Sequence, residues 1–457
     1  MLKIYDSFTQ QKQTFQPLTP GKIKLYVCGV TVYDYCHLGH ARTYTAFDMI
    51  IRYLRFRDYQ VTYVRNITDI DDKIIKRSQE NNEDPQALTA RFTQAMREDF
   101  QALGLLPADH EPRATEYIPQ MIALIEKIIA KQHAYIADNG DVCFDVRSFK
   151  NYGCLAHRDI EQLESGARVE ISEAKRDPLD FVLWKLAKLG EPAWDSPWGK
   201  GRPGWHIECS AMSMQLLGEQ FDIHGGGKDL IFPHHENEIA QSEAATHKKF
   251  VNTWMHAGYL QIAKEKMSKS LGNFLTIRDA LKQHAPEVVR YFLLASHYRS
   301  PLHYTEETLQ QTRQALARLY TALRFLPAVE PAKKTLFEER FIAAMDDDFN
   351  TPIALSALFD LAHEIQRLRE KDVDHAAALA ALLRHLGAVL GLLQADPETF
   401  FQVSENVDVK KIEALIAARN AARANKNWPE ADRLRKELSA MSIVLEDGAE
   451  GTTWKVV

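Results

Sequence analysis

The stretch that decides the fold of this chain is Ile23-Lys-Leu-Tyr-Val-Cys-Gly29. Aliphatic side chains alternate with Lys24 and Tyr26 along it, and this period of two predicts a strand that ends at Cys28-Gly29. A helix is predicted from Gly39 onward, because four apolar side chains recur there at helical spacing: Tyr44, Phe47, Ile51 and Leu54.

A second strand is predicted at Val61-Thr-Tyr-Val-Arg65, and the polar run Asn66–Lys73 follows it. Strand, glycine turn, helix and strand form a βαβ unit, which implies a parallel sheet with a right-handed crossover. Ligands of such sheets bind beyond the carboxyl ends of the strands. Cys28, Thr68 and the histidines of His37-Leu-Gly-His40 are all expected at that edge.

The chain is therefore predicted to be α/β, with a Rossmann-like, doubly wound parallel sheet split by an insertion, then a helical bundle and a small C-terminal module. Ile122–Ala130 is expected to be a helix and Asp141–Val146 a short strand of the insertion, and the sheet resumes with a strand at Gln220–His224. Further on, a leucine stripe predicts a helix that Asp396-Pro397 stops. The expected boundaries are 1–120 and 201–250 for the two halves of the Rossmann-like domain, 121–200 for the insertion, 251–305 for a region that carries the loop Lys266–Ser270, 306–400 for the bundle and 401–457 for the module.

Composition narrows the class of protein. The chain has 457 residues, of which 45% are hydrophobic and 26% charged, as in soluble globular proteins with several domains. No apolar run reaches the length of a membrane span, and the N-terminus turns polar too early for a secretory signal. Five scattered cysteines indicate a reducing cytoplasm, and the net charge of −6 argues against a general nucleic-acid coat protein.

Two short motifs carry groups that an ATP phosphate chain requires. His37-Leu-Gly-His40 offers two imidazoles at the start of a helix, and Lys266-Met-Ser-Lys-Ser270 offers two ammonium groups on a polar loop. Imidazole N–H groups donate to phosphate oxygens, and ammonium groups neutralise their charge. Alone, the lysines fit a solvated basic loop better, but the two motifs together favour a nucleotide-handling enzyme.

A metal site is suggested by the block His224–Glu238, in which three glycines permit close backbone approach or a positive φ. Pro233 suits the first turn of a helix, on which His234 and Glu238 would share one face. His235 is turned away by about 100°, although it too can reach Glu238 from the adjacent row. Cys28 and Cys209, the latter expected just before the next helix, are the best candidates for two further ligands. The alternative is a simple His–Glu hydrogen bond beside core cysteines.

With this βαβ context, the two nucleotide motifs resemble the HIGH and KMSKS motifs of class I aminoacyl-tRNA synthetases, with Leu38 as an aliphatic departure that should only pack. The likeness narrows to the cysteinyl-tRNA synthetase family and runs from end to end. The segments that carry it are Tyr26–Tyr33, Asn66–Lys73, Gly204–Ser210, His224–Glu238, Val444–Gly448 and Gly451–Trp454.

The resemblance implies an activity and its cofactors. L-Cysteine and ATP, with Mg²⁺, would form cysteinyl-adenylate, and the cysteinyl group would pass to the 3′-terminal adenosine of tRNA(Cys). One Zn²⁺ per chain would be held by Cys28, Cys209, His234 and Glu238. Cysteine and serine are nearly isosteric, so we expect zinc to select the substrate through its sulfur. A cytoplasmic monomer with no membrane contact is expected.

Roles for individual residues follow from the same resemblance and from their chemistry. His37 and His40 would donate to phosphate, Gly39 would leave room for the adenine, and Lys266 and Lys269 would neutralise the triphosphate. Thr68 and Asp229 would orient the ends of the amino acid and Trp205 would wall the pocket, although a loop hydrogen bond explains Asp229 as well. His224 and His256 either face the cleft or support it from the core.

The last segment resembles the anticodon-binding domain of that family. Basic side chains can hold phosphates and an aromatic ring can stack on a base. Trp428, Asp432 and Asp447 lie at plausible base-reading positions, whereas a solvated helix with Trp428 in a small core is the alternative. Two rival functions remain open: a ligase that gives activated cysteine to an amino sugar, which the C-terminal segment argues against, and a catalytically silent paralogue, which the intact motifs argue against.

Overall fold

The computed structural model describes residues 1–161, 174–262, 265–266, 274–402, 409–441, 443–448 and 451–456. Two compact units are present. The first comprises Met1–Ile277, Leu293–Thr305 and Ile342–Ala354, and the second comprises Arg278–Phe292, Glu306–Phe341 and Leu355–Val457. Each is described by itself below.

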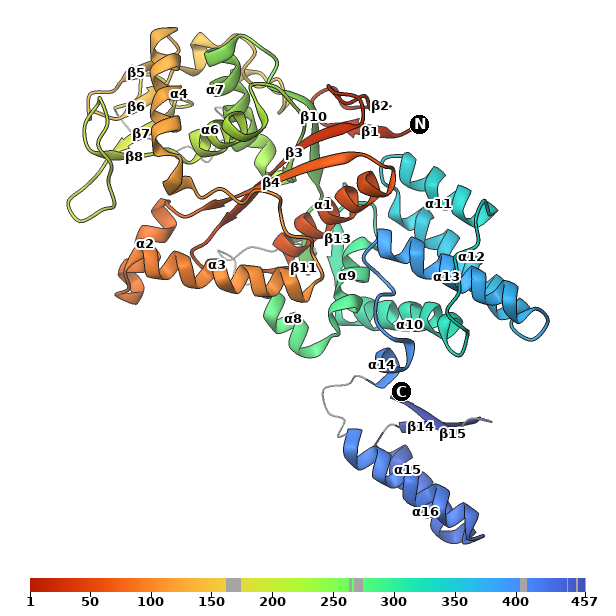
Figure 1. Ribbon diagram of the computed structural model, residues 1–457. Coiled ribbons are helices and arrows are strands. Elements are labelled where there is room, and N and C mark those ends of the chain that lie inside the picture. The colour runs from red at the N-terminus through yellow and green to blue at the C-terminus, as the bar shows by residue number, and fades with distance from the viewer. Residues whose placement is uncertain are drawn as a thin grey trace. The chain divides into compact units, whose positions relative to one another are not determined.

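The first unit is built on a four-stranded parallel sheet with the order β10-β9-β3-β4 (Figure 1). This sheet confirms the predicted doubly wound α/β fold. Its strands are β3 (Lys22–Thr31), β4 (Gln60–Thr68), β9 (Phe221–Gly227) and β10 (Val251–Ala257), and α1 (Leu38–Phe56) forms the crossover from β3 to β4. Both predicted strands of the βαβ unit extend further than their aliphatic cores, and β3 passes through Cys28 with an irregularity between Val27 and Val30.

Neighbouring residues of β9 show which helices cover which face of the sheet. His224 bonds to Glu238 of α7 (Glu236–Thr246), whereas a Cβ on Gly225 would lie 2.2 Å from the ring of Phe47 in α1. Since successive residues of a strand point to opposite faces, α1 and α7 cover opposite faces. The glycine at 225 is thus explained by close approach of α1, and its φ is not positive.

The insertion forms a second, antiparallel sheet with the order β5-β6-β7-β8. Its elements are α4 (Ile118–Ala130), β5 (Ala134–Ile136), β6 (Val142–Phe144), β7 (Phe181–Leu186) and β8 (Gly201–Pro203). The predicted helix and short strand are confirmed. The chain then enters α6 (Trp205–Leu217), which packs with α4 and α7 around the buried core of this region.

Two predicted helix positions around the metal candidates are wrong. Cys209 does not precede a helix but lies inside α6, which begins at Trp205 after Gly204 without a side-chain cap, so no N-cap residue marks the start. The helix expected from Pro233 begins at Glu236 instead, and the π-helical turn Ile231–His235, in which Phe232 is extended (φ −138°, ψ 132°), precedes it. The spacing of His234 and Glu238 survives this change.

The remaining elements of the first unit lie around this sheet. A short N-terminal hairpin, a pair of helices and a three-stranded sheet with the order β12-β11-β13 are present. They are β1 (Lys3–Asp6), β2 (Gln11–Thr14), α2 (Asp72–Asn81), α3 (Pro85–Ala102), β11 (Leu260–Ile262), β12 (Glu265–Lys266) and β13 (Leu302–Tyr304).

The second unit is mostly helical, as predicted for the C-terminal third. Its helices, some of which begin or end in the first unit, are α8 (Ile277–Gln283), α9 (Pro286–Leu294), α10 (Glu306–Leu323), α11 (Leu336–Asp346), α12 (Thr351–Leu368), α13 (Val373–Val389), α14 (Pro397–Gln402), α15 (Val409–Ala424) and α16 (Trp428–Ala440). A hairpin of β14 (Ile443–Gly448) and β15 (Gly451–Val456) ends the chain.

The leucine-rich helix α13 ends earlier than predicted. It stops at Val389 rather than at Asp396-Pro397, because Gly391 takes a positive φ of 68° and the N–H of Leu392 returns to the carbonyl of Gly387. Pro397 instead begins α14, where its missing N–H costs nothing.

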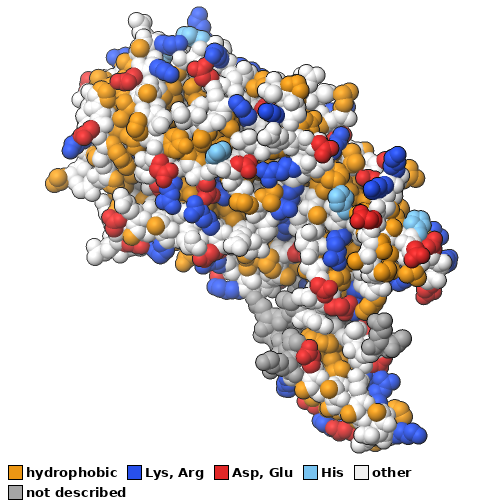
Figure 2. Space-filling model, viewed as in Figure 1, with side chains coloured by type: hydrophobic (Ala, Val, Ile, Leu, Met, Phe, Trp, Pro, Cys, Tyr) orange, Lys and Arg blue, Asp and Glu red, His pale blue; other side chains and the backbone are white. Residues whose placement is uncertain are grey.

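None of the helices in the described ranges is long and apolar enough to cross a membrane. Figure 2 shows acidic and basic side chains interspersed over the face in view.

Candidate functional site

Four side chains from three separate stretches of the sequence meet in the core of the first unit. Cys28 comes from β3, Cys209 from α6, His234 from the turn before α7 and Glu238 from α7 itself. Their ligand atoms all lie within 4.8 Å of one another, and all four side chains are buried. The four residues that the sequence singled out are therefore brought together.

The donor set fits zinc. Two sulfurs, one imidazole nitrogen and one carboxylate oxygen are ligand types that zinc prefers. Zn–S bonds of about 2.3 Å in a tetrahedron place two sulfurs about 3.8 Å apart, and the Sγ atoms of Cys28 and Cys209 are 3.7 Å apart. Nε2 of His234 lies 3.1 Å from Oε1 of Glu238.

The charges of the cluster favour the ligand forms of two of its members, Cys209 and Glu238, whereas Glu238 and Cys209 outweigh burial and raise the pKa of His234 to about 10. Burial opposes ionisation of Cys209, but a hydrogen bond from Cys28 and the charge of His234 lower its pKa to about 6. For Glu238, too, burial is outweighed, and His224 with His234 lowers its pKa to about 2. Burial and the neighbouring Cys209 raise the pKa of Cys28, so this thiol ionises last unless a cation is bound.

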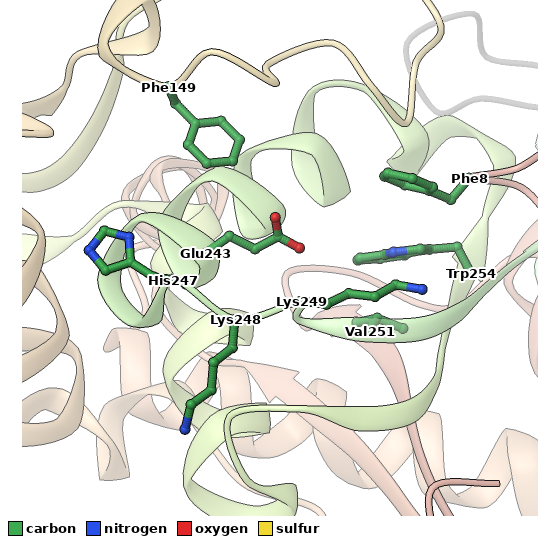
Figure 3. A pocket seen from close by; sticks show the side chains of 8 residues that line it. All are labelled: Phe8, Phe149, Glu243, His247, Lys248, Lys249, Val251 and Trp254. Carbon is green, nitrogen blue, oxygen red and sulfur yellow. The ribbon is translucent and has the colours of Figure 1, made fainter.

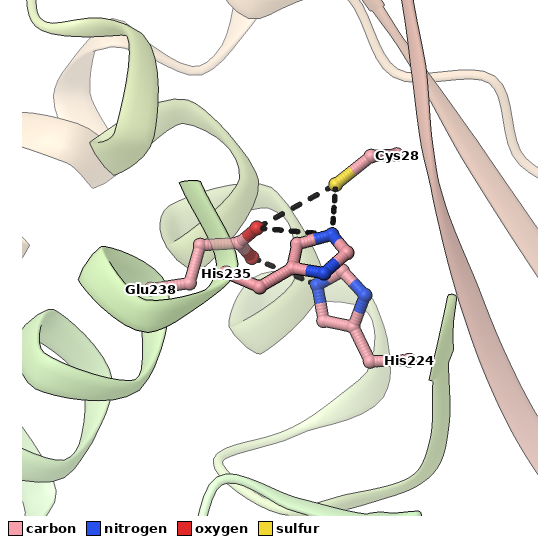
Figure 4. A group of neighbouring side chains, drawn as sticks. All are labelled: Cys28, His224, His235 and Glu238. Atoms are coloured by element: carbon pink, nitrogen blue, oxygen red, sulfur yellow. Dashed lines mark hydrogen bonds and ion pairs between the residues drawn. The ribbon is translucent and has the colours of Figure 1, made fainter. Parts of the chain in front are cut away.

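Two further histidines, His224 and His235, lie against Cys28 and Glu238 of the cluster (Figure 4). Nε2 of His224 lies 2.8 Å from Oε2 of Glu238, and Nε2 of His235 lies 3.3 Å from Sγ of Cys28. Cys28, His224, His235 and Glu238 thus form a second group with metal-binding geometry that shares two residues with the first. His235 continues to Nε2 of His256 at 2.8 Å. Burial lowers the pKa values of His235 and His256, which keeps both rings neutral.

The end of β4 supplies a polar group beside the cluster. The hydroxyl of Thr68 donates to Oε2 of Glu208 at 2.9 Å and accepts from Nδ2 of Asn66 at 3.2 Å. A hydroxyl has one proton and two lone pairs, so one lone pair of Thr68 is left to accept a further hydrogen bond. The other carboxylate oxygen of Glu208 is buried with no partner. Asn66 and Glu208 were not predicted, although each directly adjoins a predicted segment or residue.

The histidine motif forms a reciprocal cap on α1. Nδ1 of His37 accepts from the N–H groups of Gly39 (3.0 Å) and His40 (3.4 Å), and Nδ1 of His40 accepts from the N–H of His37 (3.2 Å). The two rings stack with their centroids 3.8 Å apart. Because Nδ1 accepts in both rings, the proton of each neutral imidazole sits on Nε2.

Gly39 is required by the ring beside it. A Cβ at this position would lie 2.8 Å from both Cε1 and Nδ1 of His37. We therefore expect Gly39→Ala to displace the His37 ring and to lower the turnover of the ATP-dependent activation that the resemblance implies by about tenfold or more, since positioning errors of an ångström are costly. Kinetics of ATP–pyrophosphate exchange would measure this loss. A wild-type rate, despite alanine's better helix propensity, would contradict the steric account.

The other predicted residues lie as follows. Trp205 is 37% exposed at the start of α6, and its ring lies over His234 with centroids 4.3 Å apart. Asp229 is exposed in the turn Lys228–Leu230 that follows β9. The backbone of Lys266 lies in β12, whereas its side chain and the whole of Lys269 lie outside the described residues.

The C-terminal module has its own small core of Ile412, Ile416, Leu438, Ile443 and Trp454. Trp428 begins α16 and is 58% exposed, so it is not part of that core. Asp432 is exposed on the same helix. Asp447 accepts from Arg419 and from Arg423, each at 2.7 Å, and these partners hold its pKa below the usual range.

A separate open pocket of about 400 Å³ lies beside Trp254 (Figure 3). The indole of Trp254 stacks on His224 with centroids 4.5 Å apart, so this ring links the pocket to the histidine cluster. Charged residues that line the pocket already have partners within the protein. Lys248 pairs with Glu219, and Glu243 accepts a hydrogen bond from the N–H of Phe250. None of the predicted ligand residues lines this pocket.

Comparison with known proteins agrees with this geometry over the whole chain. Residues 14–314 match the family described as tRNA synthetases class I (C) catalytic domain, residues 340–394 match the DALR domain, and residues 409–454 match the cysteinyl-tRNA ligase anticodon binding domain. The cysteine–tRNA ligase of Halorhodospira halophila (strain DSM 244 / SL1) is 62% identical, over 100% of this chain and 99% of the relative. That of Coxiella burnetii (strain Dugway 5J108-111) is 59% identical, over 99% of this chain and 100% of the relative.

A solved structure shows the same fold at low sequence identity. The Mycobacterium tuberculosis methionyl-tRNA synthetase in complex with methionyl-adenylate is 16% identical, with a TM-score of 0.57 over 86% of this chain and 94% of that chain. The family matches and the full-length relatives settle the family itself. The chain belongs to the cysteine–tRNA ligase family of class I tRNA synthetases and is an aminoacyl-tRNA ligase.

Proposed function

We propose that this chain activates L-cysteine with ATP and transfers it to the 3′-terminal adenosine of tRNA(Cys). The observation that carries the proposal is the buried meeting of Cys28, Cys209, His234 and Glu238. A Zn²⁺ ion held by these four residues would supply a soft binding position for the substrate sulfur, which a serine hydroxyl fills poorly. Tetrahedral spacing of the two Sγ atoms supports this choice of metal.

The amino-acid end of the reaction is assigned to residues around the cluster. Thr68, oriented by Asn66 and Glu208, accepts from the ammonium group. Asp229, exposed at the end of β9, can attract the same charge, and Trp205 forms a wall above His234. The substrate is thereby held at both ends before its carboxylate attacks the α-phosphate.

The nucleotide end is assigned to α1 and to the loop after β12. Nε2–H of His37 and of His40 donates to phosphate oxygens, at a helix N-terminus that also favours anions. Gly39 lets adenine approach, and Lys266 with Lys269 neutralises the triphosphate beside Mg²⁺. No protein nucleophile is needed, because in-line attack requires only positioning and charge stabilisation.

The module at 401–457 is proposed to bind the anticodon. Trp428 offers an exposed ring for base stacking and Asp432 an exposed acceptor on the same helix. Asp447 is proposed to contribute to anticodon binding from a position that its ion pairs with Arg419 and Arg423 hold in place. The match of residues 409–454 to an anticodon binding domain supports this role.

Replacing Trp428 by alanine should separate the two steps. One base–aromatic stack is worth roughly 1–3 kcal/mol, so we expect kcat/KM for tRNA to fall by about tenfold or more while cysteine-dependent ATP–pyrophosphate exchange is unchanged. Phe325→Ala, another exposed aromatic at 66%, is the matched control and should leave both activities intact. Undiminished charging by the Trp428 variant would remove this residue from the RNA contact.

The function as a whole is tested by two assays on the purified chain. We expect cysteine-dependent ATP–pyrophosphate exchange and charging of tRNA(Cys). Exchange without charging would contradict the tRNA assignment and favour another acceptor for activated cysteine. Absence of both activities would contradict the proposed function.

A further inference from the structure

One buried arginine in α1 has no role in the assignments above. Arg42 follows His40 by two residues, and its side chain is 1% exposed. Its guanidinium donates to the hydroxyl of Ser296 at 3.2 Å and to main-chain carbonyl oxygens of a single turn. These carbonyls belong to Leu293, Ser296, His297 and Ser300.

The arrangement is unusual for a buried cation. Within the described part of the chain no carboxylate pairs with Arg42, and its Nε has no partner. A buried charge without a counter-ion is costly, so an apolar side chain would fill this space more cheaply. Burial lowers the pKa of Arg42 to about 10, which leaves the guanidinium protonated at neutral pH. Its contribution is therefore to hold several main-chain carbonyls of the Leu293–Ser300 turn together.

The Leu293–Ser300 turn leads into β13, which is joined through β11 to β12, the strand that ends at Lys266. The N–H of Gly258 donates to the carbonyl of Tyr298 at 2.8 Å, and β13 pairs with β11, which pairs with β12 through Gln261 and Lys266. A Cβ on Gly258 would lie 2.3 Å from the carbonyl oxygen of Ser300, so the two segments are in tight contact.

A second connection joins the same part of α1 to the chain beyond that strand. His37 forms an antiparallel bridge with Thr276. The N–H of Leu38 donates to the carbonyl of Leu275 at 3.0 Å, and the N–H of Ile277 donates to that of Cys36 at 2.9 Å. The described segments at the two ends of the lysine motif, β12 at its start and Leu275–Ile277 after it, are thus both connected to the start of α1, which carries His37.

We propose that Arg42 is a positioning residue for ATP activation: by holding the Leu293–Ser300 turn against α1, it sets the β11–β13 sheet, and with it Lys266, at a fixed place relative to His37 and His40. This inference rests on the proposed function. Lys266 and the two histidines are proposed to act on the same triphosphate, so the distance between them matters most in the transition state. Cys28 and Thr68, on the central sheet, are not held by this contact.

The test compares Arg42→Met and Arg42→Lys with the wild type in cysteine-dependent ATP–pyrophosphate exchange. We expect kcat to fall by about 10- to 100-fold in Arg42→Met, the scale of a 1 Å misplacement. Lysine can donate to some of the same carbonyls and should restore part of this loss. The KM for cysteine and the zinc content should stay within about twofold of wild type.

Arg290 provides a matched control in the second unit. It is also 1% exposed, and its Nε donates to the carbonyl of Leu390 at 2.8 Å. Arg290→Lys should lower the melting temperature without changing exchange kinetics. If Arg42→Met does not fold, Gly258→Ala, whose Cβ would push against the carbonyl of Ser300 in the same turn, should lower kcat with an unchanged KM for cysteine.

The proposal is overturned if the Arg42 variants keep kcat within twofold of wild type, or if their KM for cysteine rises as much as kcat falls. It is also overturned if Arg290→Lys loses kcat equally, since the effect would then be general destabilisation. A wild-type chain without exchange activity would instead remove the proposed function itself.

Discussion

Replacing Cys28 by serine should raise the KM for cysteine by at least about 100-fold while the KM for ATP changes little. Loss of a partner that only orients a metal ligand already costs about 10- to 100-fold in affinity, and Cys28 is proposed as a ligand itself. Its Sγ lies 3.7 Å from that of Cys209 and 3.5 Å from Oε1 of Glu238, so serine would open one side of the cluster. Steady-state exchange kinetics with each substrate varied in turn would measure the effect.

Cys143→Ser is the matched control for this variant. Cys143 is buried at 1% exposure in the insertion sheet and lies in neither group with metal-binding geometry. The control should lose stability, from burial of a hydroxyl, but keep its KM for cysteine. If Cys28→Ser still discriminates between cysteine and serine as the wild type does, selection does not depend on this cluster.

Replacing His37 by asparagine should abolish most of the activation rate without unfolding α1. Asparagine is a good N-cap, so the N–H groups of Gly39 and His40 keep an acceptor. The imidazole donor to phosphate is lost, and removal of one such donor costs about 10²- to 10³-fold in kcat. Single-turnover formation of the adenylate would report this step without the later transfer.

His37→Ala separates the two roles of this side chain. It should be as inactive as His37→Asn but less stable by about 1 kcal/mol, the usual cost of a lost cap. Thermal unfolding of both variants would show the difference. An asparagine variant with more than a tenth of the wild-type rate would restrict His37 to its capping role.

Local patterns made each member of the ligand set a candidate, and the family resemblance joined the four into one site. Cys28 ends the aliphatic core of a strand, His234 and Glu238 are four residues apart, and Cys209 adjoins a motif of the family. Even where the local structure was predicted wrongly, as for Cys209 inside α6, the residue still reached the cluster. The spacing between two residues of a helix is the same wherever the helix begins, so an error in the predicted start does not separate them.

The features that the sequence did not predict depend on contacts between segments that lie far apart in the chain. Nothing near His224 indicates that its ring meets Oε2 of Glu238, and nothing near Arg42 indicates a cage of carbonyls some 250 residues away. The early end of α13 is different, since Gly391 was visible in the sequence but the proline beyond it was the stronger stop signal.

The central claim is that the buried cluster holds a metal that meets the substrate sulfur. X-ray absorption at the zinc edge of the purified chain, with and without substrate, tests it most directly. We predict one zinc per chain with two sulfur neighbours and two nitrogen or oxygen neighbours, and a third sulfur when cysteine is added but not when serine is added. A chain purified without zinc, or a sulfur shell that cysteine leaves unchanged, would contradict the claim.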